Sequence, residues 1–365
     1  MNLINKLSFI FLWLFLFTGC KAEFENGVSD IDSWDMADEF EPTMVVRLVH
    51  PGVLHTNEDC EHIRQMIEEK KEPYYATYQE LIKEPKASAE YSIQGPFEII
   101  ARDGTYASTK RKAESDFDAI YLNAVMWMIT QDPAHAQRSL ELMLAYAEVL
   151  KDIDGNDTAL MAGLEGIKIV YALEMLSHTY DKISETDIQK VNDMLRNVFL
   201  PVWEEFYNTN PYTNGNWGLH VTKSYMAAAI LWDDVDMYKK CVNFYLYGND
   251  NGTISHYIDG DTGQCQESGR DQQHTILGLG ALSAICELAW KQGNDLYSAY
   301  ENRVLLGYEY TVKYNLGYDV PFKTWTDVTG KYCKWDVISK ETKDKNGGVD
   351  TERGNCWQPV FYMVS

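Results

Sequence analysis

Helical segments follow one another along most of this chain, and this pattern constrains the fold more than any other feature. Within each segment apolar residues recur every three to four positions. The stretches 56–59 and 184–187 offer N-terminal caps, and Asp132 precedes Pro133 at the first position of a helix. The predicted helices cover residues 56–70, 117–128, 132–150, 157–175, 184–199, 217–232, 234–247, 267–291 and 295–313.

Short polar turns join these segments, and the alternation typical of strands is scarce. The chain shows no repeated sequence period, which disfavours the regular α-solenoids. We therefore expect an all-α fold, an (α/α) toroid or incomplete α/α barrel of antiparallel helix hairpins. The chain after Leu316 is rich in Gly, Lys and aromatic residues and is typical of a loop or short strand.

Composition excludes some classes of protein. The chain has 365 residues, 45% of them hydrophobic, which is enough for a large core and excludes general disorder. A net charge of -23 argues against nucleic-acid binding, which needs a basic surface. The 10 Trp and 24 Tyr have two interpretations, a large aromatic core or flat platforms on which sugar rings stack.

The N-terminus has the pattern of an export signal. Lys6 precedes an apolar run, residues 9–17, that is too short to span a membrane as a helix. The small residues Thr18 and Gly19 then lead to Cys20, as in the processing site of bacterial lipoproteins. We expect residues 1–20 to be a lipoprotein signal peptide, with Cys20 lipidated. An ordinary secretory signal is the alternative.

Either signal predicts an exported protein, and lipidation predicts a periplasmic, outer-membrane or cell-surface lipoprotein held to the membrane by its N-terminal lipid. Residues 21–49 are densely acidic with little apolar periodicity and predict a flexible tether. Residues 50–365 are predicted to form a single toroid domain. The chain ends within the apolar stretch 360–364, which leaves open whether that domain is truncated.

The remaining cysteines do not resemble a metal site. They are Cys60, Cys241, Cys265, Cys286, Cys333 and Cys356. None forms a CxxC pair, so a zinc cluster is disfavoured. One or two disulfides and buried free thiols are both compatible with export. We expect the activity to need no metal and no cofactor.

The first polar cluster lies in residues 264–275, with the sequence QCQESGRDQQHT. In a helix over 267–291, Glu267, Arg270 and His274 would share one face, because they are spaced i, i+3, i+7. Three ionisable groups at the mouth of a buried helix are costly unless they are paired or used. Glu267 has several interpretations: it pairs with Arg270, it orients His274, or it is a charge favoured by the helix dipole.

A second cluster lies in residues 214–220, with the sequence NGNWGLH. Asn216 and His220 are four residues apart, so both can face one cleft at a helix mouth. The alternative is a turn in which Asn216 only caps the helix. Between the two clusters, residues 256–260 form another polar turn that contains Tyr257. Helices of a toroid can open on the same rim, so the clusters are expected to converge. Neighbouring candidates for substrate binding are Trp217, Tyr225, Glu267 and Gln273.

Together, NGNWG and ESGRDQQHT resemble the alginate lyase domain family, secreted polysaccharide lyases with helical toroid folds. The resemblance covers roughly residues 50–320 and implies a uronate-containing, anionic polysaccharide as substrate. Asn216 and His220 match the family's Asn/His element, and Arg270 matches its arginine. Better-studied members carry a catalytic tyrosine seven residues after that arginine, where this chain has Leu277. The resemblance therefore leaves His274 or another tyrosine (Tyr257, Tyr225 or Tyr212) for that role.

β-Elimination explains why these residue types matter. It removes the C5 proton of a uronate and expels the 4-linked sugar, and neutralising the C6 carboxylate makes that proton more acidic. Amide and guanidinium groups, here Asn216 and Arg270, can neutralise it by hydrogen bonding. Histidine and tyrosine can act as base and acid without a metal.

Two other functions remain open at this stage. An α/α-toroid glycoside hydrolase would need two carboxylates across a cleft, and the candidates are Asp116, Asp118, Glu267 and Asp271. A non-catalytic glycan-binding lipoprotein would use the same aromatic richness and export signal without turnover.

Overall fold

The structure is a computed structural model that describes residues 42, 45, 47–209, 211, 214–330 and 335–339. The predicted signal peptide with Cys20, most of the predicted tether and Tyr212 lie outside the described residues. The α-helices are α2 (Asn57–Glu68), α3 (Tyr74–Leu81), α4 (Lys110–Thr130), α5 (Pro133–Val149), α6 (Thr158–Thr179), α7 (Glu185–Met194), α8 (Leu200–Thr209), α9 (Gly215–Leu231), α10 (Val235–Tyr247), α11 (Ile254–Tyr257), α12 (Gln272–Lys291) and α13 (Ala299–Asn315).

Shorter elements fill the connections between these helices. A π-helical segment, η4 (Leu195–Phe199), joins α7 to α8, and 3₁₀ turns occur at η2 (Pro85–Ala87) and η3 (Gly104–Thr109). The strands β1 (Ile99–Ala101) and β2 (Asp152–Asp154) pair in parallel, with Ile100 opposite Ile153. None of the described helices is both long and apolar enough to cross a membrane.

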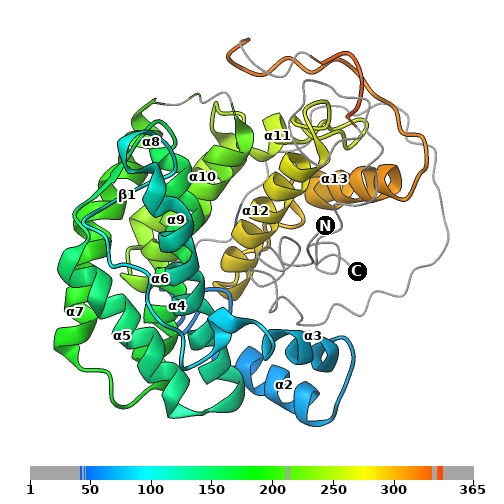
Figure 1. Cartoon of the computed structure of the whole chain (residues 1–365). Coiled ribbons are helices and arrows are strands. Elements are labelled where there is room, and N and C mark those ends of the chain that lie inside the picture. Colours follow the sequence, from blue (N-terminus) through cyan, green and yellow to red (C-terminus); the bar gives the residue numbers. More distant parts are fainter. Residues whose placement is uncertain are drawn as a thin grey trace.

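Two layers of helices make up the body of the fold (Figure 1). Helix α6 packs against α4 on one side and α9 on the other, and α9 packs against α12. These four helices are buried on nearly all faces, whereas α5, α7 and α10 bury only one face. Such burial is expected when amphipathic helices cover an inner row of apolar ones. The expected all-α, incomplete (α/α) toroid is confirmed.

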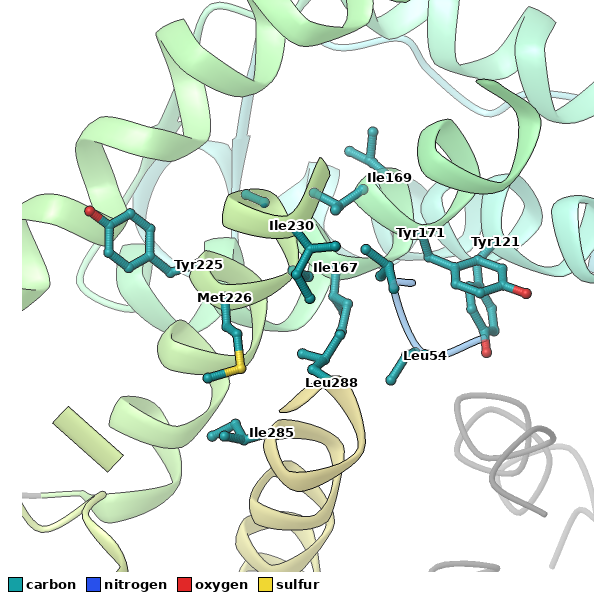
Figure 2. Packing of buried hydrophobic residues seen from close by; sticks show 14 of the residues in the cluster. Leu54, Tyr121, Ile167, Ile169, Tyr171, Tyr225, Met226, Ile230, Ile285 and Leu288 are labelled. Carbon is teal, nitrogen blue, oxygen red and sulfur yellow. The ribbon is translucent and has the colours of Figure 1, made fainter. Parts of the chain in front are cut away.

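The core is continuous between the inner helices. Figure 2 shows Ile167 of α6, Met226 and Ile230 of α9, and Ile285 of α12 in one hydrophobic cluster. Gly163 lets α6 approach α9 closely, because a Cβ at this position would lie 2.7 Å from the backbone of His220. The packing of α6 against α9 thereby fixes the backbone of His220, one of the predicted catalytic residues.

Most predicted helix boundaries agree with the structure to within a few residues, but two predictions at the C-terminal end were wrong. Helix α12 begins at Gln272 rather than at residue 267, because the Asp271 side chain caps it by accepting from the His274 backbone N–H. In α13, residues 300–302 have left-handed backbone angles, so the right-handed helix is shorter than predicted. Helices α3, α8 and α11 were not predicted. The described part of the chain after Leu316 is loop, as expected.

Four cysteines within the described residues, Cys60, Cys241, Cys265 and Cys286, are buried free thiols. This agrees with the free-thiol interpretation for these four. Cys333 and Cys356 lie outside the described residues.

Candidate active site

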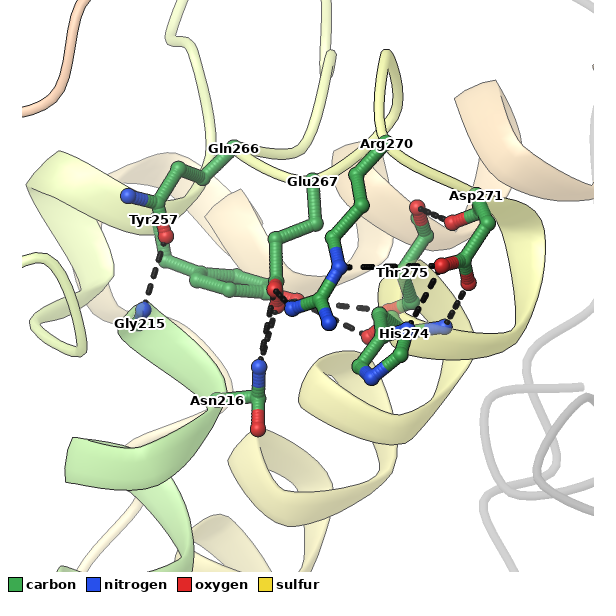
Figure 3. A network of polar contacts seen from close by, with 9 residues as sticks. All are labelled: Gly215, Asn216, Tyr257, Gln266, Glu267, Arg270, Asp271, His274 and Thr275. Carbon is green, nitrogen blue, oxygen red and sulfur yellow. Dashed lines mark hydrogen bonds and ion pairs between the residues drawn. The ribbon is translucent and has the colours of Figure 1, made fainter. Parts of the chain in front are cut away.

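The two polar clusters meet where the start of α9 faces the turn before α12 (Figure 3). The Gln266 side chain accepts a hydrogen bond from the Gly215 backbone N–H at 2.9 Å, which joins the segments beside the cluster. Asn216 lies in the first turn of α9, and Glu267, Arg270 and His274 come from the other segment. The fold therefore brings these residues of the two clusters together, as expected, although the clusters are distant in the sequence.

Glu267 is the centre of this network. Its side chain is fully buried, and its carboxylate accepts from the Asn216 Nδ2 at 2.8 Å to each oxygen. Arg270 Nη1 donates to the same carboxylate at 3.0 Å. A buried carboxylate with amide and guanidinium donors is compensated for its lost hydration. Glu267 thus holds the two predicted carboxylate-neutralising side chains in one place.

Asp271 and His274 form a second pair at the start of α12, beside Arg270. The Asp271 carboxylate lies 2.6 Å from His274 Nδ1, and Arg270 Nε lies 3.7 Å from the same carboxylate. A carboxylate at Nδ1 favours the tautomer with the hydrogen on Nδ1, which leaves a lone pair on Nε2. The His274 side chain is 26% exposed, so part of the ring can be reached from solvent.

Tyr257 contacts this network from the interior of the protein. Its ring is fully buried, and its hydroxyl lies 3.4 Å from Glu267 Oε2 and from the backbone oxygens of His274 and Thr275. A side chain at Gly278 would collide with that hydroxyl, so the glycine makes room for the ring. The structure thus places Tyr257 in contact with the cluster, at its buried side.

His220 lies one turn after Asn216 on α9 and is almost completely buried. Its Nδ1 lies 3.0 Å from the Nζ of Lys223, a fully buried lysine on the same helix. Burial, followed by the Lys223 charge, lowers the pKa of His220 well below its usual range, so the imidazole is neutral at pH 7. When Lys223 is protonated it donates to Nδ1, which leaves the hydrogen of His220 on Nε2.

Lys223 gives a test of this buried pair through the pH dependence of stability. Burial lowers its pKa to about 7 in the folded protein, against about 10.4 in an unfolded chain. Between these values the unfolded state binds the extra proton, so stability rises with pH, by at most about 1.4 kcal/mol per pH unit. We expect Lys223→Met to be more stable than wild type at pH 7 and to lose that advantage toward pH 10. Chemical unfolding of both proteins at several pH values measures this, and a constant difference would contradict it.

The predicted substrate-binding residues do not all lie close to the cluster. Trp217 and Gln273 are half-buried and adjacent in sequence to Asn216 and His274. Tyr225 is nine residues beyond Asn216 on α9, about 13 Å along the helix axis. Its ring packs against Trp203 and Tyr207, so the structure does not bring it to the cluster.

Of the four candidate carboxylates for hydrolysis, Glu267 and Asp271 belong to the cluster described above, whereas Asp116 and Asp118 are engaged elsewhere in the structure. Asp116 is fully buried and accepts hydrogen bonds from the hydroxyls of Tyr91 and Tyr146 and from the backbone N–H groups of residues 94 and 95. Asp118 lies 2.6 Å from the ammonium groups of both Lys86 and Lys168. Neither is poised as an acid or base beside an open cleft.

Sequence reasoning predicted the wrong geometry for the Glu267–Arg270–His274 stripe. The first two residues precede α12, and a turn brings them together instead, with the Arg270 backbone N–H donating to the Glu267 carbonyl at 2.8 Å. It also missed Asp271 as the partner of His274, and gave Glu267 as one alternative for that role, whereas the pairing of Glu267 with Arg270 is the interpretation that the structure shows. The signal was present, because a helix-capping Asp three residues before a His puts both side chains in reach of one another.

Comparison with known proteins identifies the chain. The model of the alginate lyase family matches residues 68–319. The chain belongs to the alginate lyase family. It is a polysaccharide lyase, and its family implies a polyuronate substrate. No curated protein sequence matches it.

Solved structures of alginate lyases share the fold of this family member. Alginate lyase A1-III from Sphingomonas species A1 has 13% sequence identity and a TM-score of 0.58, over 74% of this chain and 80% of its own. A variant of A1-III in complex with a tetrasaccharide has 15% identity and the same TM-score, over 75% and 80%. An alginate lyase from Bacteroides ovatus has 13% identity and a TM-score of 0.56, over 76% and 88%.

Proposed function

We propose that this lyase cleaves alginate or a related uronate-containing polysaccharide by a β-elimination that needs no metal. The observation that carries the proposal is the convergence of Asn216 and Arg270 on one buried carboxylate, that of Glu267, next to the Asp271–His274 pair. The tetrasaccharide bound to A1-III shows that a relative with this fold accommodates an oligosaccharide.

Arg270 is the main candidate for neutralising the C6 carboxylate of the substrate. Its guanidinium has five N–H donors, and the contact with Glu267 uses the Nη1 end. Glu267 anchors the guanidinium, so its positive charge is held in a fixed place where a substrate carboxylate can pair with it. Negative charge moves onto the C6 carboxylate oxygens as the C5 proton leaves, and pre-oriented donors stabilise that charge.

His274 is our candidate for the base that removes the C5 proton. With Asp271 holding Nδ1, its Nε2 keeps a lone pair, and the side chain is partly exposed. The neutral His220 suits a different role, because the hydrogen on its Nε2 makes it a donor to substrate oxygen. Tyr257 remains the tyrosine candidate for protonating the leaving oxygen, and its burial requires that the site open around its hydroxyl on binding.

The product distinguishes elimination from hydrolysis and from binding alone. Elimination leaves an unsaturated uronate that absorbs ultraviolet light, whereas hydrolysis and binding do not. We expect absorbance to rise with at least one of polymannuronate, polyguluronate and glucuronan, and not with a neutral polysaccharide. Release of reducing ends without ultraviolet absorbance would instead indicate a glycoside hydrolase, and tight binding without products would indicate a glycan-binding protein.

His220→Ala is expected to lower the rate of elimination by about 10²-fold or more, because a buried donor at the site is lost. The rate of ultraviolet absorbance increase measures this. His135→Ala, which changes a half-buried histidine of α5, is a matched control and should keep wild-type activity. Full activity of His220→Ala, with the fold intact by circular dichroism, would remove His220 from the site.

We also propose that the chain is exported and anchored through Cys20, as its N-terminal sequence predicts. Incorporation of labelled fatty acid in a bacterial host tests this, with Cys20→Ser as the variant. Label in both proteins or in neither would contradict lipidation at this residue.

A further inference from the structure

A second group of convergent side chains lies away from the proposed active site, at the C-terminal end of α6. Glu174 and His178 are one turn apart on this helix, and His50 comes from the segment that precedes α2. His50 Nδ1 lies 2.9 Å from Glu174 Oε1, and His178 Nε2 lies 3.5 Å from Glu174 Oε2. The three potential ligand atoms all lie within 4.8 Å of one another.

The surroundings of Glu174 favour a cation between these three side chains. Its side chain is 1% exposed, and Oε1 accepts from the Gly52 backbone N–H at 3.1 Å. Oε2 has no aligned hydrogen-bond donor among the described residues. The two imidazole rings stack with centroids 5.0 Å apart, so protonating both would place like charges in contact. The last turn of α6 adds the negative end of a helix dipole.

We propose that His50, Glu174 and His178 bind one divalent transition-metal ion, with Zn²⁺ as the best fit to this ligand set. Two imidazole nitrogens and one carboxylate oxygen are ligands that Zn²⁺ uses in proteins. Ligand atoms at about 2.1 Å from a tetrahedral ion lie roughly 3.4 Å from one another. The separations of 2.9 Å from His50 to Oε1 and 3.5 Å from His178 to Oε2 lie on either side of that value, and all three ligand atoms lie within 4.8 Å of one another, so side-chain adjustments complete the site.

Residues around the cluster supply the support that metal sites need. His50 Nε2 lies 3.2 Å from Asp233 Oδ1, so a carboxylate faces the nitrogen that would not bind the ion. Such carboxylates orient metal-binding histidines. His178 also lines a pocket of about 220 Å³ together with Cys60, Arg64 and Met128, and its side chain is 38% exposed. Three protein ligands leave the fourth position of a tetrahedral ion to water.

The ion would fasten the N-terminal segment to the inner helix layer. His50 and Glu174 are 124 residues apart in sequence, so the site joins distant parts of the chain and forms only in the folded protein. Without the ion, His50 Nδ1 and Glu174 are joined directly by their 2.9 Å contact. Zn²⁺ binds the neutral form of an imidazole, so we place the test at pH 8.

Zinc titration of the purified, chelator-stripped protein tests the proposal without using lyase activity. We expect wild type to take up one equivalent of Zn²⁺ in competition with a chromophoric chelator. His178→Ala should weaken that equivalent at least about tenfold. Saturating zinc should raise the Tm of wild type by at least about 2 °C and leave the Tm of the variant unchanged.

Two further variants make the result decisive. His62→Ala removes a partly buried histidine of α2 outside the cluster and should keep both the equivalent and the Tm rise. Glu174→Gln retains the size of the side chain and should lose zinc binding. Replacement of His178 is not expected to unfold the protein, because its side chain is 38% exposed. No binding by wild type, or equal binding by wild type and His178→Ala, would show that the cluster is an ion pair bridged by a proton.

Discussion

Arg270→Ala is expected to lower kcat/KM for the preferred polyuronate by about 10³-fold or more. The guanidinium is the only positive side chain that the structure places on the Glu267 carboxylate among the described residues, and it lies 13% exposed at the site. Its loss removes the charge that stabilises the developing carboxylate dianion in the transition state. Ultraviolet detection of the unsaturated product measures the change. The kcat/KM of Arg270→Lys is expected to lie between those of wild type and Arg270→Ala, because an ammonium keeps the charge but not the planar geometry of the guanidinium.

The alanine variant also leaves Glu267 buried with fewer donors, so its folding is checked separately. Circular dichroism and the Tm identify a variant that has lost structure rather than chemistry. Arg196→Ala is the matched control, because Arg196 stacks on Trp232 away from the site and should affect neither rate nor fold. A folded Arg270→Ala variant with wild-type kcat/KM would refute the site assignment.

His274→Ala is expected to lower kcat by about 10²- to 10⁴-fold, the range for loss of a general base. Asp271→Asn should lower kcat as well while leaving KM near wild type, because an amide does not favour the hydrogen on Nδ1 as a carboxylate does. Asparagine caps a helix about as well as aspartate, so α12 should remain intact. Steady-state kinetics with the ultraviolet assay separate kcat from KM.

Asp234→Asn provides the control for the capping role. Asp234 caps α10 through the Met237 backbone N–H and is not paired with a histidine in the structure. The two Asp→Asn changes should have similar small effects on Tm and very different effects on kcat. Equal activity of Asp271→Asn and wild type would mean that His274 does not need a carboxylate partner and is not the oriented base.

Local sequence patterns were enough to predict the architecture. The helical periods and caps are properties of neighbouring residues, and Asp132 before Pro133 begins α5 as predicted. Patterns failed where a single side chain overrode the period. Asp271 interrupts an apparently continuous helix and makes Glu267 and Arg270 part of a turn. Helix α3 has only eight residues and no side-chain cap, so little in the sequence marks it.

The sequence by itself determined which chemical groups this protein has and that its helices pair into a toroid, because both depend on residue type and short-range spacing. It also carried the family resemblance that the family model confirms. Only the tertiary structure decided which groups touch. Asn216 and Glu267 are 51 residues apart, and His50 and Glu174 are 124 apart. Contacts over such separations come from helix packing, which no local pattern contains, so the partners of Glu267 and the proposed metal site appear only when the chain is folded.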